Sequence, residues 1–563
     1  MKILALHVDY IEFKPLKKAL KSIGELSEKE KKGGRAEEAL VVLTAVEKKD
    51  RDTKEVVKKL VESVKEIADQ VKPKNIVLYP YAHLSSDLAS PQIAEKTLDE
   101  AEIQLKKLYS VTRAPFGYYK EFEMKVKGHP LSELSRDISI EGKETEEYDP
   151  KQLLKDISKS KLDTSKLKDN DHRIIANKLD LFSFNEVAPG MVFWHNNGLI
   201  IKNALIDFWR ELHRSFGYNE ISTPQILDTK LWQISGHWEK YRDNIFLTKY
   251  EKRDFAVKPM NCPGGLMVYK SSPKSYKDLP LKVAELGIVH RQGLSGVLGG
   301  IFRVIQFMQD DAHIFCNEEQ LEKEILGVMK MVDLIYSKFG FKYKIELSTR
   351  PEKRIGSDAM WDKAENALET VLKKNDYKFK INKGDGAFYG PKIDFHLQDS
   401  LGRTWQCGTI QADFSMPERF EIEYTDKDNK KKRPIMVHRA IYGSLERFIG
   451  ILLEHLNGNL PMWLSPNQIR ILPMTDRNIE SSKKVENELK QQGFRVDLDE
   501  RAESMSKKVR DAQLEKYNYM IIIGDKEEKS GKYSIRTREG RVEFDVSPEE
   551  FIEKIKKEVQ NRS

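Results

Sequence analysis

The change of hydrophobic pattern along the chain is the feature that most constrains its fold. Residues 1–143 alternate strand-like with helix-like segments, and residues 465–563 follow a β-α-β-α-β order. Residues 189–464 carry segments in which apolar and polar side chains alternate, which is typical of an antiparallel sheet with one polar face. Residues 144–188 are polar and rich in lysine. We therefore predict an α+β multidomain protein, with 144–188 as a linker that holds one or two helices.

The composition narrows the class of protein. A chain of 563 residues with 39% hydrophobic content suffices for three or four domains, at about one per 150 residues, and is too apolar to be disordered. No run of ~18 apolar residues occurs, so no membrane span is predicted. Three scattered cysteines are too few for a disulfide framework, and we expect a cytoplasmic protein. The net charge of +7 permits a polyanionic partner without requiring one.

One thiol and two imidazoles form a candidate metal site. Cys262 stands beside a Pro-Gly pair, and His313 and His438 lie at the edges of apolar strands. Such a set suits zinc, and three protein ligands leave the fourth tetrahedral position open. Because the ligands are 51 and 125 residues apart, their spacing is no zinc-finger signature. From the residues alone, a buried thiol and two hydrogen-bonded histidines are the commoner arrangement.

Three arginines form a candidate anion site. Arg291 and Arg303 stand at the two ends of a glycine-rich loop, and Arg447 is at the start of a helix. Arginine binds phosphate with two parallel hydrogen bonds, and glycine lets the backbone approach a ligand. A lone arginine more often forms a surface ion pair, but three in one polar-lined sheet favour anion binding. No GxxxxGK[ST] segment is present, which excludes a P-loop nucleotide site.

Several segments, in order and spacing, resemble class II aminoacyl-tRNA synthetases, and specifically the threonyl-tRNA synthetases. Between Trp194 and Glu454 they are FWHNNG, SGHWEKYRDNIF, KPMNCPG, QDDAHIF, FYGPKIDF, WQCGTIQADF and HRAIYGSLERFIGIL. Residues from 465 onward resemble the anticodon-binding domain shared by several of these enzymes. Residues 1–143 resemble the editing domain of archaeal threonyl-tRNA synthetases, itself similar to D-aminoacyl-tRNA deacylases, through YPYAHLSS, APFGYYK and GHPLSELSR.

This resemblance implies both fold and activity. The expected fold is a deacylase-like α/β editing domain (1–143), an antiparallel class II catalytic core (189–464) and an α/β anticodon-binding domain (465–563). The expected activity is the activation of L-threonine with ATP and Mg²⁺, followed by transfer to tRNA(Thr) and hydrolysis of mischarged seryl-tRNA(Thr). The family also implies a homodimer built on the helix at 198–216 and Pro224.

The resemblance further implies one zinc ion per chain, held by Cys262, His313 and His438. Valine is nearly isosteric with threonine, and an apolar pocket discriminates poorly between them, whereas a Lewis-acidic metal requires a hydroxyl group. Serine has that hydroxyl and lacks only a methyl group, worth ~1–3 kcal/mol. A second, hydrolytic site is therefore needed, and residues 1–143 are expected to supply it.

Individual roles follow by matching motifs. We expect Arg291 to hold the α-phosphate and carboxylate of the adenylate, Arg447 the γ-phosphate of ATP, and Asp311 the threonine amino group. With Arg291 and Arg447, Lys392 and His237 are assigned as catalytic, His237 near the terminal ribose of tRNA. Further residues expected to bind substrate or ATP are Arg303, Gln309, Tyr389, Gln406, Thr409 and Gln411. Expected editing-site residues are His83, Tyr119, Lys120 and Glu133.

The chain departs from the family pattern on the nucleotide side. After Arg291-Gln292, Gly293 replaces a glutamate that supports adenine binding, and Ile305 replaces an arginine. Histidine is frequent at Gly265 and Gly299 in relatives, and threonine at Met308. The alternative is therefore a synthetase-derived tRNA-binding or regulatory protein, or an engineered variant, with impaired aminoacylation. The retained arginines and metal ligands argue against it.

Overall fold

The computed structural model describes residues 1–20, 23–50, 53–85, 87–138, 167–293 and 299–562. The chain divides into two compact units, Met1–Asp149 and Pro150–Ser563. Each unit has hydrophobic clusters of its own, so each is described separately. Most of the predicted linker, residues 144–166, lies outside the described residues.

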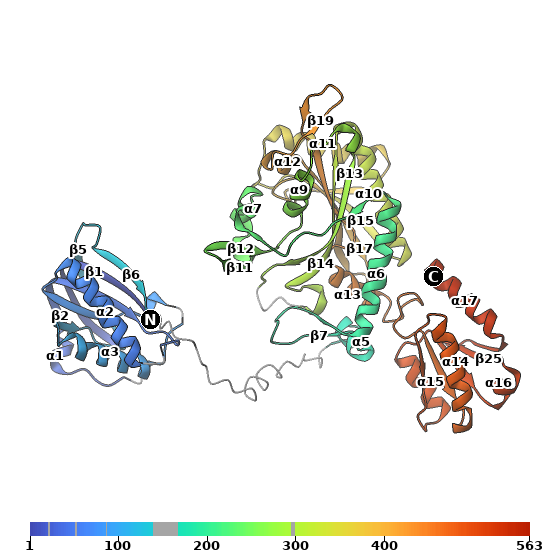
Figure 1. Cartoon of the computed structure of the whole chain (residues 1–563), viewed down its shortest axis with the longest axis horizontal. Coiled ribbons are helices and arrows are strands. Elements are labelled where there is room, and N and C mark those ends of the chain that lie inside the picture. Colours follow the sequence, from blue (N-terminus) through green and yellow to red (C-terminus); the bar gives the residue numbers. More distant parts are fainter. Residues whose placement is uncertain (21–22, 51–52, 86, 139–166, 294–298, 563) are drawn as a thin grey trace. The chain divides into compact units, whose positions relative to one another are not determined.

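The first unit is a six-stranded mixed sheet in the order β4-β3-β2-β1-β5, with β6 paired to the first part of β1. β2, β3 and β4 run parallel, and β1 is antiparallel to its neighbours. Figure 1 shows α2 and α3 against one face of this sheet, the α/β architecture expected. The elements are β1 (Lys2–Lys18), α1 (Glu28–Lys31), β2 (Gly34–Ala45), α2 (Thr53–Val71), β3 (Asn75–Pro80), η1 (Ala82–Leu84), α3 (Pro91–Leu105), β4 (Ser110–Arg113), β5 (Tyr118–Val126) and β6 (Glu133–Asp137).

The second unit contains an eight-stranded sheet in the order β16-β15-β17-β18-β21-β14-β13-β9. Its six central strands are antiparallel, as predicted, and only the short edge strands β9 and β16 run parallel to their neighbours. The strands are β9 (Asn219–Glu220), β13 (Leu281–His290), β14 (Gln306–Cys316), β15 (Lys342–Ser348), β16 (Phe379–Asn382), β17 (Lys392–Gln398), β18 (Thr404–Asp413) and β21 (Ile435–Ala440).

Helices and smaller elements surround this sheet. Apolar side chains at helical spacing on α6, such as Ile201, Leu205 and Trp209, join the same buried cluster as those of α10 and α13. The larger helices are α5 (His172–Leu179), α6 (Asn196–Ser215), α9 (Cys262–Lys270), α10 (Glu318–Lys338), α11 (Asp358–Lys374) and α13 (Leu445–His455). The smaller elements are β7 (Phe182–Ser183), β8 (Phe193–Trp194), β10 (Ile226–Asp228), α7 (Thr229–Ile234), α8 (His237–Tyr241), η2 (Arg242–Asn244), β11 (Leu247–Tyr250), β12 (Arg253–Val257), η3 (Tyr276–Asp278), η5 (Gly300–Phe302), α12 (Ser415–Arg419), β19 (Tyr424–Thr425) and β20 (Lys431–Lys432).

Helix α5 lies within the segment predicted as a linker. Its N-cap is Asp171, whose carboxylate accepts the N–H of Arg173, and it ends at Asp180, which has a positive φ of 53°. Ile175 and Leu179 are buried in the main cluster of the second unit. This part of the polar segment therefore contributes to the core of that unit.

Residues 469–561 form a second, smaller sheet in the order β23-β22-β24-β25-β26. The parallel strands β23, β22 and β24 with crossover helices confirm the predicted β-α-β-α-β order, and an antiparallel hairpin extends the sheet. The elements are β22 (Ile469–Pro473), η6 (Asp476–Asn478), α14 (Ile479–Gln491), β23 (Val496–Leu498), α15 (Met505–Leu514), β24 (Tyr519–Ile523), α16 (Asp525–Ser530), β25 (Tyr533–Thr537), β26 (Val542–Val546) and α17 (Pro548–Asn561).

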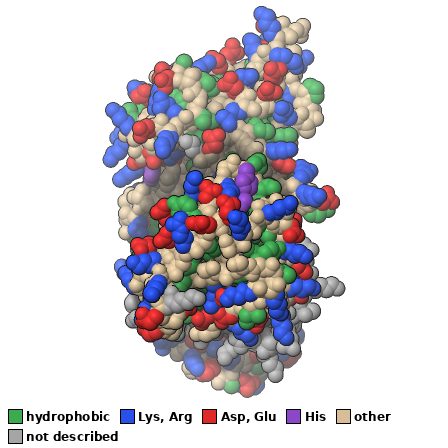
Figure 2. Space-filling model, turned by 90° about the vertical axis from the view of Figure 1, so that its left-hand side faces the viewer, with side chains coloured by type: hydrophobic (Ala, Val, Ile, Leu, Met, Phe, Trp, Pro, Cys, Tyr) green, Lys and Arg blue, Asp and Glu red, His purple; other side chains and the backbone are tan. Residues whose placement is uncertain are grey.

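The surface carries charges of both signs. On the face drawn in Figure 2, lysine and arginine side chains are interspersed with acidic ones and do not gather into one basic patch. This agrees with 96 basic and 89 acidic residues in the sequence. Among the helices of the described residues, none is both long and apolar enough to cross a bilayer.

Candidate active site

Three elements bring the predicted metal ligands together. Cys262 is the first residue of α9, and the pairing of β14 with β21 places His313 directly opposite His438. One donor atom from each residue lies within 4.8 Å of the others. All three side chains are buried.

The surroundings of this cluster fit a bound cation. His313 Nε2 is buried without a hydrogen-bond partner in the described residues. The Nε2 of His438 lies 2.9 Å from a carboxylate oxygen of Asp413, an outer contact of the kind that orients metal-binding imidazoles. Burial raises the pKa of Cys262, and the nearby carboxylates of Asp311 and Asp413 raise it further, so a cation is needed to favour the thiolate. The donor set of one sulfur and two nitrogens suits zinc.

Strand alternation extends this site along the sheet. Gln309, Asp311 and His313 are two residues apart on β14 and therefore share one face. Asp311 accepts a hydrogen bond of 3.3 Å from Asn261, and burial raises the pKa of its carboxyl to about 6. On the adjoining elements, the Tyr389 hydroxyl donates to Gln411 at 2.7 Å.

A bulge in β18 determines to which face of the sheet three other predicted residues point. The register between β17 and β18 pairs Phe395 with Gly408 but His396 with Gln406, so Cys407 is the extra residue. Gln406 is exposed, and Thr409 and Gln411 are half-buried, whereas Cys407 and Gly408 are buried. Because of this extra residue, Gln406 can point to the same face of the sheet as Thr409 and Gln411.

A cavity of about 620 Å³ opens on this face. The predicted residues that line it are His237, Arg291, Arg303, Gln309, Gln406, Thr409 and Arg447. Asp311, Tyr389, Lys392 and Gln411 do not line it. The cavity thus brings together the arginines and the polar side chains of β14 and β18.

The arginines of the cavity have no acidic partner among the described residues. Arg291 uses its Nε to donate to the Pro259 carbonyl at 3.0 Å, and Arg447 uses its Nε to donate to the Phe302 carbonyl at 2.9 Å. In the described part of the chain, no carboxylate forms an ion pair with Arg291, Arg303 or Arg447. Three guanidinium groups without an ion-pair partner in the described residues give the cavity the charge and donors that suit an anion of several charges.

Lys392 and His237 differ in their surroundings. Lys392 pairs with Asp394 at 2.6 Å and Asp385 at 3.2 Å. Asp394, which the sequence analysis missed, also accepts a hydrogen bond of 2.6 Å from Gln406 and so orients a residue of the cavity. His237 Nε2 has no partner in the described residues, and burial, with the charge of Arg291, lowers the pKa of this imidazole to about 3. His237 is therefore a neutral side chain beside the arginines.

Two of the five departures from the family pattern, Gly293 and Gly299, have open space around them. A Cβ on Gly293 would meet no atom within 4 Å, and residues 294–298 lie outside the described residues. Ile305 lines the cavity in place of a basic residue. Gly265 is different, because a Cβ there would lie 3.3 Å from His313 Nδ1. Gly299 has no atom within 4 Å of a built Cβ, and the Met308 N–H donates to Glu446 at 2.9 Å.

The predicted editing residues lie in the first unit and form a looser set. Lys120 Nζ donates to the carbonyls of Pro115 and Tyr118, and burial lowers its pKa to about 8. The His83 ring lies 5.5 Å from that of Tyr81. Tyr119 and Glu133 are exposed. In the described residues, no hydrogen bond or ion pair joins any two of His83, Tyr119, Lys120 and Glu133.

Family comparisons agree with this architecture. Residues 246–456 match the class II tRNA synthetase core domain (G, H, P, S and T), and residues 468–558 match an anticodon-binding domain. Together with the antiparallel sheet and the arginine-lined cavity, these matches define a class II aminoacyl-tRNA synthetase. Residues 1–138 match the archaea-specific editing domain of threonyl-tRNA synthetase.

Individual relatives narrow the family. The crystal structure of the RNA-binding domain of threonyl-tRNA synthetase from Cryptosporidium parvum is 41% identical, with a TM-score of 0.66, over 69% of this chain and 98% of that one. A threonyl-tRNA synthetase structure from Aeropyrum pernix is 29% identical, with a TM-score of 0.62, over 69% of this chain and 96% of that one. The protein belongs to the threonyl-tRNA synthetase family.

Longer relatives show how much of the family this chain represents. It is 53% identical over 396 residues to a threonine–tRNA ligase of Caldanaerobacter subterraneus and 52% identical over 396 residues to one of Clostridium botulinum. These matches cover 70% of this chain and 62% of each relative. The chain therefore spans less than two thirds of the length of the curated relatives it matches.

Proposed function

We propose that the second unit activates L-threonine with ATP and transfers it to tRNA(Thr). The observation that carries this proposal is the set of three arginines without acidic partners in one cavity, on the same sheet face as Asp311 and the Cys262–His313–His438 cluster. A triphosphate supplies the missing negative charge, and the threonine amino group would donate a hydrogen bond to Asp311.

The chemistry needs no protein nucleophile. The threonine carboxylate attacks the α-phosphorus of ATP and pyrophosphate leaves, while Arg291 and Arg447 hold the phosphates and offset the charge that develops on them. The 3′-hydroxyl of the terminal adenosine of tRNA then attacks the adenylate carbonyl, and AMP leaves. His237, neutral and beside Arg291, would contact the ribose. Mg²⁺ accompanies ATP as part of the substrate.

Cys262, His313 and His438 would hold one zinc ion per chain. When bound, zinc supplies a Lewis acid that takes the amino and hydroxyl groups of threonine. Asp413 orients His438, and the absence of a side chain on Gly265 leaves room for the His313 ring. Serine also carries a hydroxyl group, so this site discriminates poorly against it.

We further propose that the first unit hydrolyses seryl-tRNA(Thr). Lys120 has a pKa of about 8, so near neutral pH it can donate to a developing oxyanion while part of it is already deprotonated. His83, Tyr119 and Glu133 would line that site. The proposal extends to a cytoplasmic homodimer that forms through α6 and the Pro224 segment.

The second candidate is a tRNA-binding or regulatory protein without aminoacylation, favoured by Gly293 and Ile305. Threonine-dependent exchange between ATP and pyrophosphate separates the two. We expect exchange by the full chain that requires threonine and is lost in Arg447→Ala. Binding of tRNA(Thr) without any exchange would support the second candidate and reject the first.

A further inference from the structure

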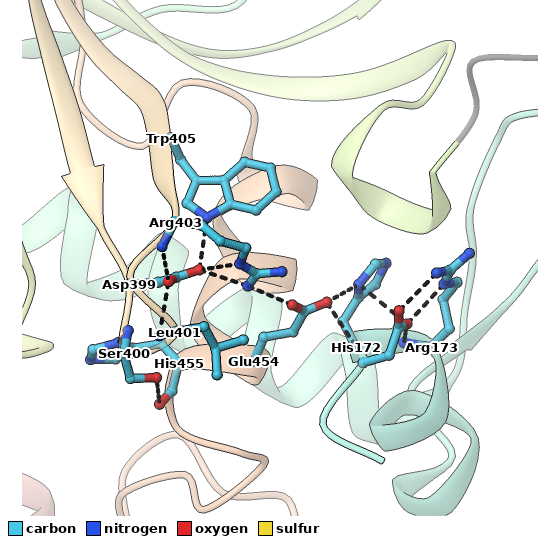
Figure 3. A network of polar contacts seen from close by, with 10 residues as sticks. His172, Arg173, Asp399, Ser400, Leu401, Arg403, Trp405, Glu454 and His455 are labelled. Atoms are coloured by element: carbon cyan, nitrogen blue, oxygen red, sulfur yellow. Dashed lines mark hydrogen bonds and ion pairs between the residues drawn. The ribbon is translucent and has the colours of Figure 1, made fainter. Parts of the chain in front are cut away.

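The contacts of His172 reach from the start of the second unit to the wall of the cavity. His172 is the first residue of α5, is fully buried, and is not among the residues matched to family motifs. Figure 3 shows it between Glu454 of α13 and the segment that contains Arg173. Its Nδ1 lies 2.6 Å from Glu454, and its Nε2 lies 3.1 Å from the Ile301 backbone nitrogen of η5.

The two partners fix the tautomer of this imidazole. Burial would raise the pKa of Glu454, but hydrogen bonds from His172 and an ion pair with Arg403 hold it below its ordinary value, so the carboxylate accepts. Nδ1 must therefore carry the proton. A backbone N–H can only donate, so Nε2 must present its lone pair to Ile301. His172 is thus a neutral side chain that donates on one side and accepts on the other.

The shape of η5 depends on this contact. Gly300 has a φ of +60°, and a Cβ there would lie 2.1 Å from His172 Nε2, so the backbone approaches the ring more closely than any other residue permits. The Phe302 ring packs with centroid distances of 4.2 Å to His172 and 4.5 Å to Trp405. The η5 segment is therefore held in two ways: the Ile301 backbone nitrogen contacts His172, and the Phe302 ring packs against His172 and Trp405.

Helix α13 carries both Glu454, which contacts His172, and Arg447, which lines the cavity. Arg447, Gly450 and Glu454 lie at helical spacing on one stripe of this helix. Glu454 holds His172, and the absence of a side chain on Gly450 leaves room for Ile301 and Phe302, which a Cβ would approach to 3.0 Å. Arg447 donates to the Phe302 carbonyl at 2.9 Å. Both Phe302 and Arg447 line the cavity.

We propose that His172 is a positioning residue for the phosphate-binding Arg447. By accepting the Ile301 N–H it fixes the η5 backbone, and the carbonyl of Phe302 in turn orients the Arg447 guanidinium toward the nucleotide. This role rests on the proposed binding of ATP in the cavity. The Asp171–His172–Glu454 group is not a second metal site, because Arg173 and Arg403 already neutralise its two carboxylates.

Two substitutions in the full chain separate the two hydrogen bonds. The amide nitrogen of Asn in His172→Asn stands near the place of Nδ1 and keeps the bond to Glu454 but not that to Ile301. The longer amide of Gln in His172→Gln brings an acceptor to the place of Nε2 and keeps the bond to Ile301. We expect His172→Asn to raise the KM for ATP in pyrophosphate exchange roughly three- to tenfold, the value of one lost hydrogen bond. His172→Gln should stay closer to wild type, and the KM for threonine should not change in either variant.

Hydrogen exchange of the Ile301 amide gives a readout that does not depend on activity. Its protection should fall in His172→Asn and persist in His172→Gln, while thermal unfolding shows that both variants are folded. Unchanged protection in His172→Asn, or an equal rise in the KM values for ATP and threonine, overturns the proposal. Absence of threonine-dependent exchange in the wild type instead rejects the proposed function, and the Ile301 amide then tests only whether His172 fixes the η5 backbone.

Discussion

The two ends of the sheet face that carries the candidate site differ in how firmly the fold holds them. At the metal end, Cys262, His313 and His438 are 4%, 2% and 5% exposed, and sheet register, together with Asp413, fixes the two imidazoles. At the nucleotide end, Gly293 has no atom within 4 Å of a built Cβ. Gly299 is equally open, and Ile305 lines the cavity. Two departures from the family pattern, Gly293 and Ile305, thus line the cavity of the arginines, whereas Gly265 adjoins His313 of the buried cluster.

The largest effect should come from the metal end. Cys262→Ser removes the sulfur ligand, and because loss of an outer contact alone costs about 10–100-fold in metal affinity, loss of a ligand should cost more than about 100-fold. We expect near one zinc per wild-type chain by elemental analysis, and little zinc and no threonine activation in the variant.

Cys316→Ser is a matched control, because Cys316 is also buried but lies outside the cluster. It should retain the metal. A zinc-free wild-type protein that still activates threonine would contradict the role proposed for the metal end.

Deleting residues 1–143 tests whether the metal end can exclude serine without help. The first unit has its own hydrophobic cluster, so the second should remain folded and activate threonine. One methyl group gives about 10–200-fold discrimination, so seryl-tRNA(Thr) should accumulate at a corresponding fraction of total charging. Gel assays of charged tRNA measure it, and persistent discharge of serine would place hydrolysis elsewhere.

Asp413→Asn tests the same comparison between the metal end and the nucleotide end, with a smaller expected effect on metal affinity. The variant keeps the shape of the side chain but loses the charge that faces His438 Nε2 at 2.9 Å. Metal affinity should fall about 10–100-fold, measured by competition with a chromophoric chelator. An affinity equal to that of the wild type would show that the imidazole is oriented by the sheet alone.

Gly293→Glu should have the smallest effect and act at the other end. It restores a carboxylate where relatives use one for adenine binding, and there is space for its Cβ. One hydrogen bond is worth ~0.5–1.5 kcal/mol, so the KM for ATP should fall roughly three- to tenfold without change in that for threonine. A shift in the KM for threonine, or no shift at all, would contradict the assignment.

The sequence predicted the kinds of sheet better than the contacts between strands. Alternating segments indicated the antiparallel core, and β-α-β-α-β order indicated the parallel sheet that ends the chain. Spacing alone could not bring His313 and His438 together, because it contains no information about the register of β14 and β21. The resemblance to the family filled that gap. The bulge at Cys407 also has no sequence signal by itself, although it decides which residues of β18 face the cavity.

The role of α5 was missed for a different reason. Its polar neighbours led to the prediction of a linker with one or two helices, and the burial of Ile175 and Leu179 in the core of the second unit was not predicted. A buried histidine contact with a segment 129 residues away depends on tertiary packing, which single-sequence patterns do not describe.

The pairing of His313 with His438 also sets an order of events during folding. A slip of one residue between β14 and β21 would turn one imidazole to the opposite face of the sheet. A cation can therefore be held only after these distant strands have paired in register and α9 has docked beside them. For the metal site proposed above, the metal content of a preparation would therefore count the chains in which this pairing is complete.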